Sequence, residues 1–242
     1  MKKFFLFIIF FLYSIFLYSI DINSLTPTGW VNDYASLLTQ EEKIKIESLI
    51  SEFEHKTGNE IAVVIIKSLE DNNLEDFTNR LFERWGIGKK GKDNGIMLFI
   101  ALKERKIRIE IGYGLEAFIS DSLAGNIIRE VIVPYFKQNQ YYDGIYAGVF
   151  EIASIIAQKT GVVLDKSYTP KVTRVNKIGS IVFLFIFIFF ILPVFMRHPW
   201  LFLFFISSGR GGGRYYGGGF GGGGFGGFGG GLSGGGGASG GW

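Results

Sequence analysis

The fold class is decided by the stretch Ile61-Ala62-Val63-Val64-Ile65-Ile66, in which every side chain is apolar and most are β-branched. Runs of this length and composition are typical of strands that are buried on both faces of a sheet. Residues 96–102 form a second apolar run, and residues 107–111 alternate apolar and charged side chains, which predicts a strand with one more polar face. Residues 103–106 are a connection of hairpin length between these two strands.

Helical periodicity surrounds the predicted strands. Thr39-Gln40-Glu41-Glu42 has the pattern of a capping box, and apolar residues then recur at helical spacing until Gly58. Further helices are predicted at about residues 74–85, 121–136 and 143–158. A strand–helix–strand crossover, then a hairpin, then helices predicts an α/β domain with a mixed β-sheet sandwiched between helices (αβα).

Segments of different composition flank this domain, which we place at residues 28–160. Residues 1–20 begin Met1-Lys2-Lys3 and continue with an apolar run, which indicates a signal peptide or a signal anchor. Residues 178–196 carry no charge and, at about 1.5 Å per residue, are long enough for a transmembrane helix. The remaining segments are a basic linker at 161–177, an interfacial apolar segment at 197–208 and a Gly-rich tail at 209–242.

The Gly-rich tail is expected to be disordered, because glycines bury too little apolar surface to offset the entropy of ordering them. The N-terminal signal predicts that the domain is extracytoplasmic, and a single span at residues 178–196 would then place the tail in the cytoplasm. The basic linker would lie on the outer side, against the positive-inside rule. A hairpin formed by the two apolar runs around Arg197-His198-Pro199 is the alternative.

The composition excludes several classes of site. The chain has no cysteine, which excludes disulfides, thiol catalysis and cysteine-bound zinc. His55 and His198 are the only histidines and lie far apart in the sequence, so a Ser-His-Asp triad is not expected. The whole chain carries a net charge of +3, whereas residues 28–160 carry −4, so no nucleic-acid partner is expected.

Several loop motifs follow one another in a defined order. They are Val31-Asn32-Asp33-Tyr34-Ala35, Lys92-Asp93-Asn94-Gly95, the stretch Arg108–Glu116 and the segment Gly144–Gly148. Together they resemble the TPM domain family over residues 28–160, and the C-terminal Gly-Ala-Ser-Gly-Gly-Trp ending also resembles bacterial members. The resemblance implies an αβα sandwich. Members have been linked to acid phosphatase activity, divalent-metal binding in the loops, photosystem repair and receptor accessory roles, so it implies no single activity.

Acidic residues near the predicted strand ends are the candidate metal ligands, namely Asp33, Asp93, Glu110, Glu116 and Asp121. Hard cations such as Ca²⁺ or Mg²⁺ bind several oxygen ligands at one point, and the resemblance implies that these loops converge. Three of these residues also have an ordinary structural interpretation. Asp121 beside Ser120 suits a helix N-cap, and Asp93 suits a turn. Glu110 could pair with Arg108 or with a Lys or Arg side chain on a neighbouring strand.

Three functions follow from these observations. The favoured one is a membrane-anchored exported domain that binds a divalent cation and serves as an accessory or interaction module for envelope membrane proteins. The alternatives are a weak metal-dependent phosphatase and a structural envelope protein. A phosphatase would need a carboxylate-bound cation to activate water, because the chain has no cysteine nucleophile. The expected partners are therefore the lipid bilayer and a membrane protein, and no catalytic residue is identified.

Overall fold

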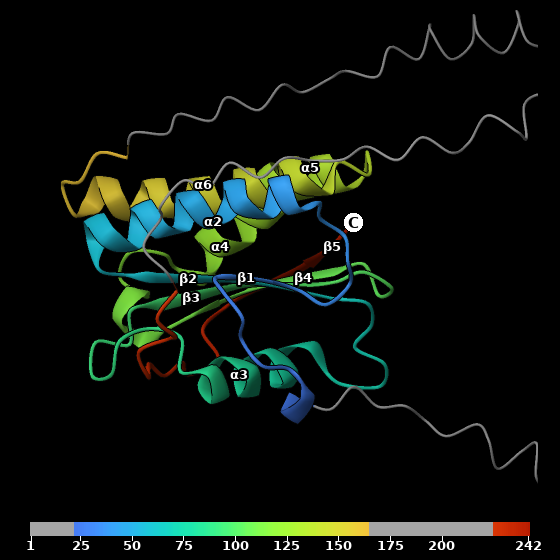
Figure 1. Cartoon of the computed structure of the whole chain (residues 1–242), viewed down its shortest axis with the longest axis horizontal. Helices are drawn as coiled ribbons and strands as arrows, with labels where there is room; N and C mark the ends of the chain where they lie inside the picture. Colours follow the sequence, from blue (N-terminus) through green and yellow to red (C-terminus); the bar gives the residue numbers. More distant parts are fainter. Residues whose placement is uncertain (1–21, 165–224) are drawn as a thin grey trace, which may run out of the picture. The chain divides into compact units, whose positions relative to one another are not determined.

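A computed structural model of the chain describes residues 22–164 and 225–242, and its centre is one five-stranded sheet (Figure 1). The strands are β1 (Val31–Asp33), β2 (Glu60–Ile66), β3 (Gly95–Ala101), β4 (Lys106–Ile111) and β5 (Gly237–Gly241), and they lie in this order across the sheet. Strands β1, β2 and β3 are parallel, whereas β4 runs antiparallel to both β3 and β5. The predicted crossover and hairpin are therefore confirmed.

The helices also follow the predicted pattern. They are η1 (Ile22–Ser24), α2 (Gln40–Thr57), α3 (Leu74–Trp85), η2 (Tyr113–Leu115), α4 (Asp121–Asn126), the π-helix η3 (Ile127–Ile132), α5 (Val133–Phe136) and α6 (Tyr141–Lys159). Thr39 and Glu42 form the predicted capping box, and Gly58 ends α2 in a left-handed conformation. The helix predicted at 121–136 is interrupted by the π-helical turn η3, which the apolar periodicity did not indicate.

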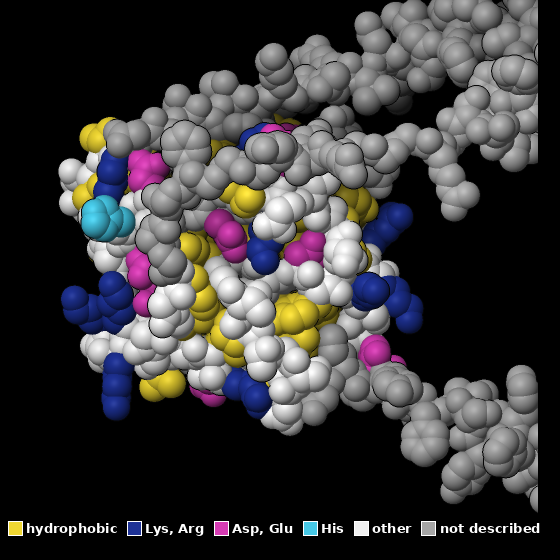
Figure 2. All heavy atoms as spheres, viewed as in Figure 1, with side chains coloured by type: hydrophobic (Ala, Val, Ile, Leu, Met, Phe, Trp, Pro, Cys, Tyr) yellow, Lys and Arg dark blue, Asp and Glu magenta, His cyan; other side chains and the backbone are white. Residues whose placement is uncertain are grey.

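Helices cover both faces of the sheet, which confirms the αβα arrangement (Figure 1). Alternate side chains of β2 point to opposite faces, as the pleat requires. Ile61, Val63 and Ile65 belong to the core beneath α2 and α6, whereas Val64 and Ile66 belong to the core beneath α3. On the face shown in Figure 2, side chains of both charge signs lie among apolar ones, and no patch of one sign covers it.

The segments predicted to contact the membrane are not described. The expected signal at 1–20 and the expected transmembrane helix at 178–196 lie outside residues 22–164 and 225–242, as do most of the basic linker and the interfacial segment. Within the two described ranges, no helix is both long enough and apolar enough to span a bilayer.

Residues 225–242, called here the C-terminal segment, correct the expectation of a disordered tail. Their last residues form β5, which pairs with β4 from Lys106↔Gly241 to Glu110↔Gly237. The expectation was wrong for this segment because it considered only how little apolar surface glycine buries. Glycine also lets a backbone approach its neighbours closely, and the contacts described below depend on that. Residues 209–224 lie outside the described ranges.

Candidate functional site

A buried ion pair lies on the central part of β4. Arg108 is 5% exposed and Glu110 is fully buried, although alternation predicted a more polar face for these positions. Arg108 Nε and Nη2 lie 2.7 and 2.6 Å from Glu110 Oε2. In the register with β3, Arg108 is opposite Phe99 and Glu110 is opposite Met97, so both charges face the core beneath α3. The pairing of Glu110 with Arg108, one of the sequence alternatives, is therefore present.

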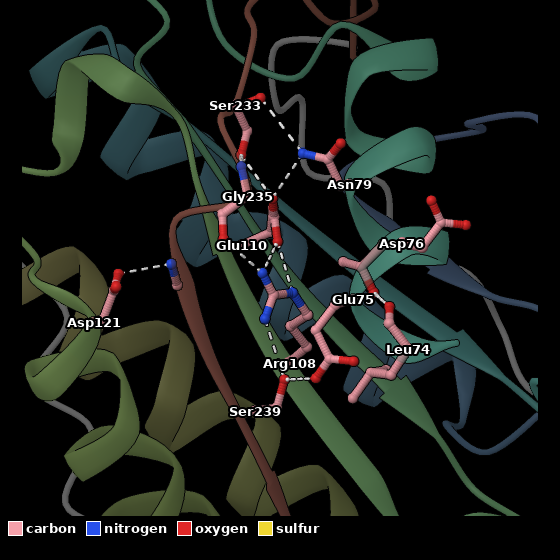
Figure 3. A network of polar contacts seen from close by, with 12 residues as sticks. Leu74, Glu75, Asp76, Asn79, Arg108, Glu110, Asp121, Ser233, Gly235 and Ser239 are labelled. Carbon is pink, nitrogen blue, oxygen red and sulfur yellow. Dashed lines mark hydrogen bonds and ion pairs between the residues drawn. The ribbon is translucent and has the colours of Figure 1, made fainter. Parts of the chain in front are cut away.

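The C-terminal segment supplies much of the remaining hydrogen bonding of this ion pair (Figure 3). Ser233 Oγ donates to Glu110 Oε1 at 2.6 Å. Arg108 Nη2 donates to the carbonyl oxygen of Gly235 at 2.9 Å, and Arg108 Nη1 donates to Ser239 Oγ at 3.1 Å. Buried charges are costly unless they are paired and fully hydrogen-bonded, so the segment stabilises donors and acceptors that the ion pair itself does not satisfy.

Helix α3 closes the other side of the same network (Figure 3). Asn79 Nδ2 donates to Glu110 Oε1 at 3.1 Å. The Ser239 hydroxyl donates to Glu75 Oε1 at 2.8 Å, and this bond is the main reason that the pKa of Glu75 lies below its ordinary value. The segment thus lies beside β4 at the edge of the sheet, and hydrogen bonds join it to both β4 and α3.

Close packing explains why the segment is rich in glycine. Gly237 has a left-handed φ of 136°, and a Cβ atom there would overlap the carbonyl oxygen of Ile109. A Cβ on Gly234 would lie 2.5 Å from the Tyr113 hydroxyl, and one on Gly240 would lie 2.6 Å from Ile128 Cγ2. These positions accept no larger side chain without a shift of their neighbours.

Aromatic rings anchor the two ends of the segment. At the C-terminus, the Trp242 ring lies edge-on to Phe136 with a centroid distance of 4.8 Å and also contacts Tyr141. At the other end, Phe228 stacks on Trp85 at 6.1 Å. Beside it, the Gly229 amide donates to Glu60 Oε2 at 3.3 Å. Burial raises the pKa of Glu60, while hydrogen bonds from backbone amides oppose that shift.

Three of the predicted acidic residues lie around the segment. Asp93 Oδ1 accepts a hydrogen bond from the Leu232 amide at 3.0 Å, and Asp121 Oδ1 accepts one from the Gly237 amide at 2.8 Å. A Cβ on Gly236 would lie 2.8 Å from Glu116 Oε1, so that carboxylate also lies against the segment. We refer to Asp93, Glu116 and Asp121 as the acidic rim. Ser120, rather than Asp121, is the N-cap of α4.

The sequence matches one known protein family over most of the domain. A family described as TPM domain matches residues 31–155, which is more than half of the chain. The chain belongs to the TPM domain family. The recognition from loop motifs is therefore confirmed.

One solved structure agrees with this assignment. The solution NMR structure of the N-terminal domain of a protein from P. gingivalis is 30% identical, has a TM-score of 0.52, and covers 58% of this chain and 89% of that chain. The NMR structure of the BA42 protein from Bizionia argentinensis is 22% identical, with a TM-score of 0.46, and covers 52% of this chain and 86% of that one. A search of curated proteins gave no match.

The five predicted ligands of this TPM domain do not converge on one point. Asp33 ends β1 and accepts hydrogen bonds from the amides of Ala35 and Leu38, at 3.0 and 2.8 Å. Because β1, β2 and β3 are parallel, Asp33 lies at their carboxyl ends, whereas Asp93 precedes β3 at the opposite end. Glu110 is held by Arg108. The described ranges contain no group of three or more His, Cys, Asp or Glu side chains that could hold a metal ion.

The sequence analysis missed the polar groups that complete the site. Ser233, Ser239 and Trp242 were treated as part of a disordered Gly-rich tail, and Asn79 was not singled out within the predicted helix at 74–85. A signal for them was present, because the C-terminal segment interrupts its glycines with a few specific side chains. The Arg-x-Glu pattern on a strand between apolar residues also indicated that charges on β4 would need partners.

Proposed function

We propose that this protein is a membrane-anchored interaction module of the cell envelope, in which the β4 edge of the TPM domain accepts an extended C-terminal strand. The observation that carries the proposal is the pairing of β5 with β4 over a buried ion pair that the added strand helps to satisfy. Addition of a peptide strand to an exposed sheet edge is a common mode of recognition, in which backbone hydrogen bonds supply affinity and side-chain pockets supply specificity.

The edge has the properties of a binding surface rather than of a stable free edge. Without β5, the outward amides and carbonyls of β4 would be unpaired, and unpaired edges are prone to associate with other strands. The Ile111 amide donates to the Gly236 carbonyl oxygen at 2.9 Å, and the Trp242 backbone amide donates to the Arg105 carbonyl oxygen at 3.3 Å. The strand therefore covers the edge along its whole length.

Membrane anchoring is part of the proposal. The apolar segments at residues 1–20 and 178–196 support an anchor, and the signal supports export of the domain. Strands that pair must lie in the same compartment, so the β4–β5 pairing favours an extracytoplasmic position for the C-terminal segment as well. We therefore replace the expected cytoplasmic tail with an arrangement in which the chain returns to the side of its domain.

The chain lacks cysteine, which allows a direct test of this topology. Val163 and Leu232 are exposed, at 78% and 52%, and suit single substitutions to cysteine. A membrane-impermeant maleimide applied to intact cells should label Val163→Cys and Leu232→Cys alike. Labelling of Leu232→Cys only after the membrane is permeabilised would refute the shared compartment.

The phosphatase alternative gains no support from the described residues. The candidate carboxylates are divided between the two ends of the parallel strands and the ion pair with Arg108. A cation that activates water needs several oxygen ligands at one point. Ca²⁺ or Mg²⁺ binding is therefore retained only as a prediction for the acidic rim, which would be open to a cation when the C-terminal segment is not bound.

Hydrogen exchange of the full-length protein tests the proposed interaction module. The Ile111 amide, bonded to Gly236, reports on the β4 edge, and the Val63 amide, bonded to Trp30, reports on the core. Gly237→Ala should raise exchange at Ile111 and leave Val63 protected, because its Cβ would overlap the Ile109 carbonyl. Gly226→Ala is the matched control, since a Cβ there meets no atom within 4 Å. Unchanged protection of Ile111 in Gly237→Ala would contradict the proposal.

A further inference from the structure

We infer that the β4 edge binds one defined sequence, residues 233–242 of this chain, in preference to other extended glycine-rich strands. This inference rests on the proposed function and names the ligand. The ligand is the peptide of residues 233–242 of this chain, with serines at positions 233 and 239, glycines at 234, 237 and 240, and tryptophan at 242.

Backbone hydrogen bonds alone do not fix the register of a glycine-rich strand. A one-residue slip moves every side chain to the other face of the sheet, and a strand with few side chains resists such a slip poorly. Strand β5 is Gly237-Ala238-Ser239-Gly240-Gly241, so its backbone bonds alone would permit several registers. The few non-glycine side chains, and the positions where only glycine fits, must therefore determine which register forms.

The two serines set the register through the buried charges. Ser233 donates to Glu110, and Ser239 both accepts from Arg108 and donates to Glu75. A shift of the strand by one residue would remove the hydroxyls from the ion pair and leave buried charged groups without those hydrogen bonds. Hydrogen bonds to charged groups are stronger than those between neutral groups, so the correct register is selected at these points.

The glycines and the tryptophan exclude other sequences. Gly237 lies against the Ile109 carbonyl and Gly240 lies against the buried Ile128 side chain, so a side chain at either would clash. A side chain at Gly234 would have to displace the Tyr113 ring. Trp242 fills the space beside Phe136 and Tyr141 at the end of the strand. A peptide with the same composition in another order would place side chains where only backbone fits.

Peptide binding to the full-length protein tests this reading. The acceptor is the Gly237→Ala chain, whose own segment is disabled, with the Val63 amide as the check that its core is folded. Labelled peptides of residues 225–242 serve as probes. One has the native sequence and one carries the control substitution Gly226→Ala. The other three carry Ser233→Ala together with Ser239→Ala, Trp242→Ala alone, or a scrambled sequence at residues 233–242. The native and Gly226→Ala peptides should bind equally. The serine and tryptophan variants should each bind roughly tenfold more weakly or worse, and the scrambled peptide should not bind.

The wild-type chain is a second acceptor that needs no substitution. Its own segment occupies the edge, so the native peptide should bind it at least tenfold more weakly than it binds the Gly237→Ala chain. Equal binding of native and scrambled peptides would overturn the sequence reading and leave the strand-accepting module standing. Absence of binding by every peptide would overturn both, as would equal affinity of the native peptide for the two acceptors. Appearance of dimers that exchange segments between wild-type copies supports the reading, because the same sequence is then bound from a second chain.

Discussion

Replacement of Glu110 by leucine tests the energetic basis of the site. The substitution places an apolar side chain of similar size in a fully buried position and removes the partner that Arg108 contacts at 2.7 and 2.6 Å. It also removes the acceptor of the hydrogen bonds from Asn79 and Ser233. Loss of one member of a buried ion pair costs roughly 3–5 kcal/mol, because the other charge stays buried and uncompensated. For a domain of this size the melting temperature should fall by roughly 6–20 °C.

Thermal unfolding of the full-length protein, followed by circular dichroism, measures this effect. Arg108→Leu combined with Glu110→Leu should recover most of the lost stability, since an apolar pair of similar volume needs no hydrogen bonds. Glu116→Ala on the exposed acidic rim is the control and should change stability by no more than about 0.5 kcal/mol. A cost below about 1 kcal/mol for Glu110→Leu would refute the argument that the ion pair is desolvated and depends on its hydrogen-bonding partners.

Three further outcomes follow from the same contacts. The pKa of Glu75 is lowered mainly by the hydrogen bond from the Ser239 hydroxyl. This bond should therefore stabilise the pairing of β5 with β4 above pH 4.5, the ordinary pKa of the carboxyl group, and the stabilisation should be lost as the pH falls through the lowered pKa. Titration of the carboxyl group by NMR should show a higher pKa of Glu75 in Ser239→Ala. Saturating Ca²⁺ should leave the melting temperature of the intact protein equal to that in EDTA, because Asp93 and Asp121 of the acidic rim already accept hydrogen bonds from the C-terminal segment. If a cation did bind, a concentration of 100 times its dissociation constant would raise the free energy of unfolding by about 2.7 kcal/mol. Trp242→Ala should raise hydrogen exchange at Ile111 and leave the core protected, and equal exchange in the two proteins would show that the aromatic contact with Phe136 does not hold the strand.

The central architecture could be predicted because local and global signals agree there. The apolar run at Ile61–Ile66 corresponds to a strand that is buried on both faces, and the capping box at Thr39 begins α2 as expected. The alternation at residues 107–111 predicted the strand β4 correctly. These elements depend on periodicity and on capping chemistry, which short stretches of sequence contain in full.

The candidate site could be predicted only in part, because it depends on contacts between distant segments. The sequence identified Asp93, Glu110 and Asp121, and it allowed the pairing of Glu110 with Arg108. However, each of the three also has a hydrogen-bond partner more than a hundred positions away, in the C-terminal segment. The composition of that segment predicted disorder, since a glycine-rich chain has little apolar surface to bury. Composition does not contain the information that a neighbouring strand has an open edge and two buried charges.

The use of glycine for this strand follows from two opposing requirements. The carbonyl oxygen of Ile109 approaches Gly237 so closely that only a backbone without a Cβ atom fits there. Glycine, however, loses more conformational entropy on ordering than any other residue, which weakens a strand made of it. The free energy that holds β5 must then come from its backbone pairing with β4 together with a few side-chain contacts, namely the hydrogen bonds to Arg108 and Glu110 and the Trp242 ring. A strand stabilised in this way depends on a small number of side chains for its register and for part of its affinity. Loss of those few contacts would weaken its pairing with β4, and this makes the C-terminal segment suited to exchange at the edge of the TPM domain.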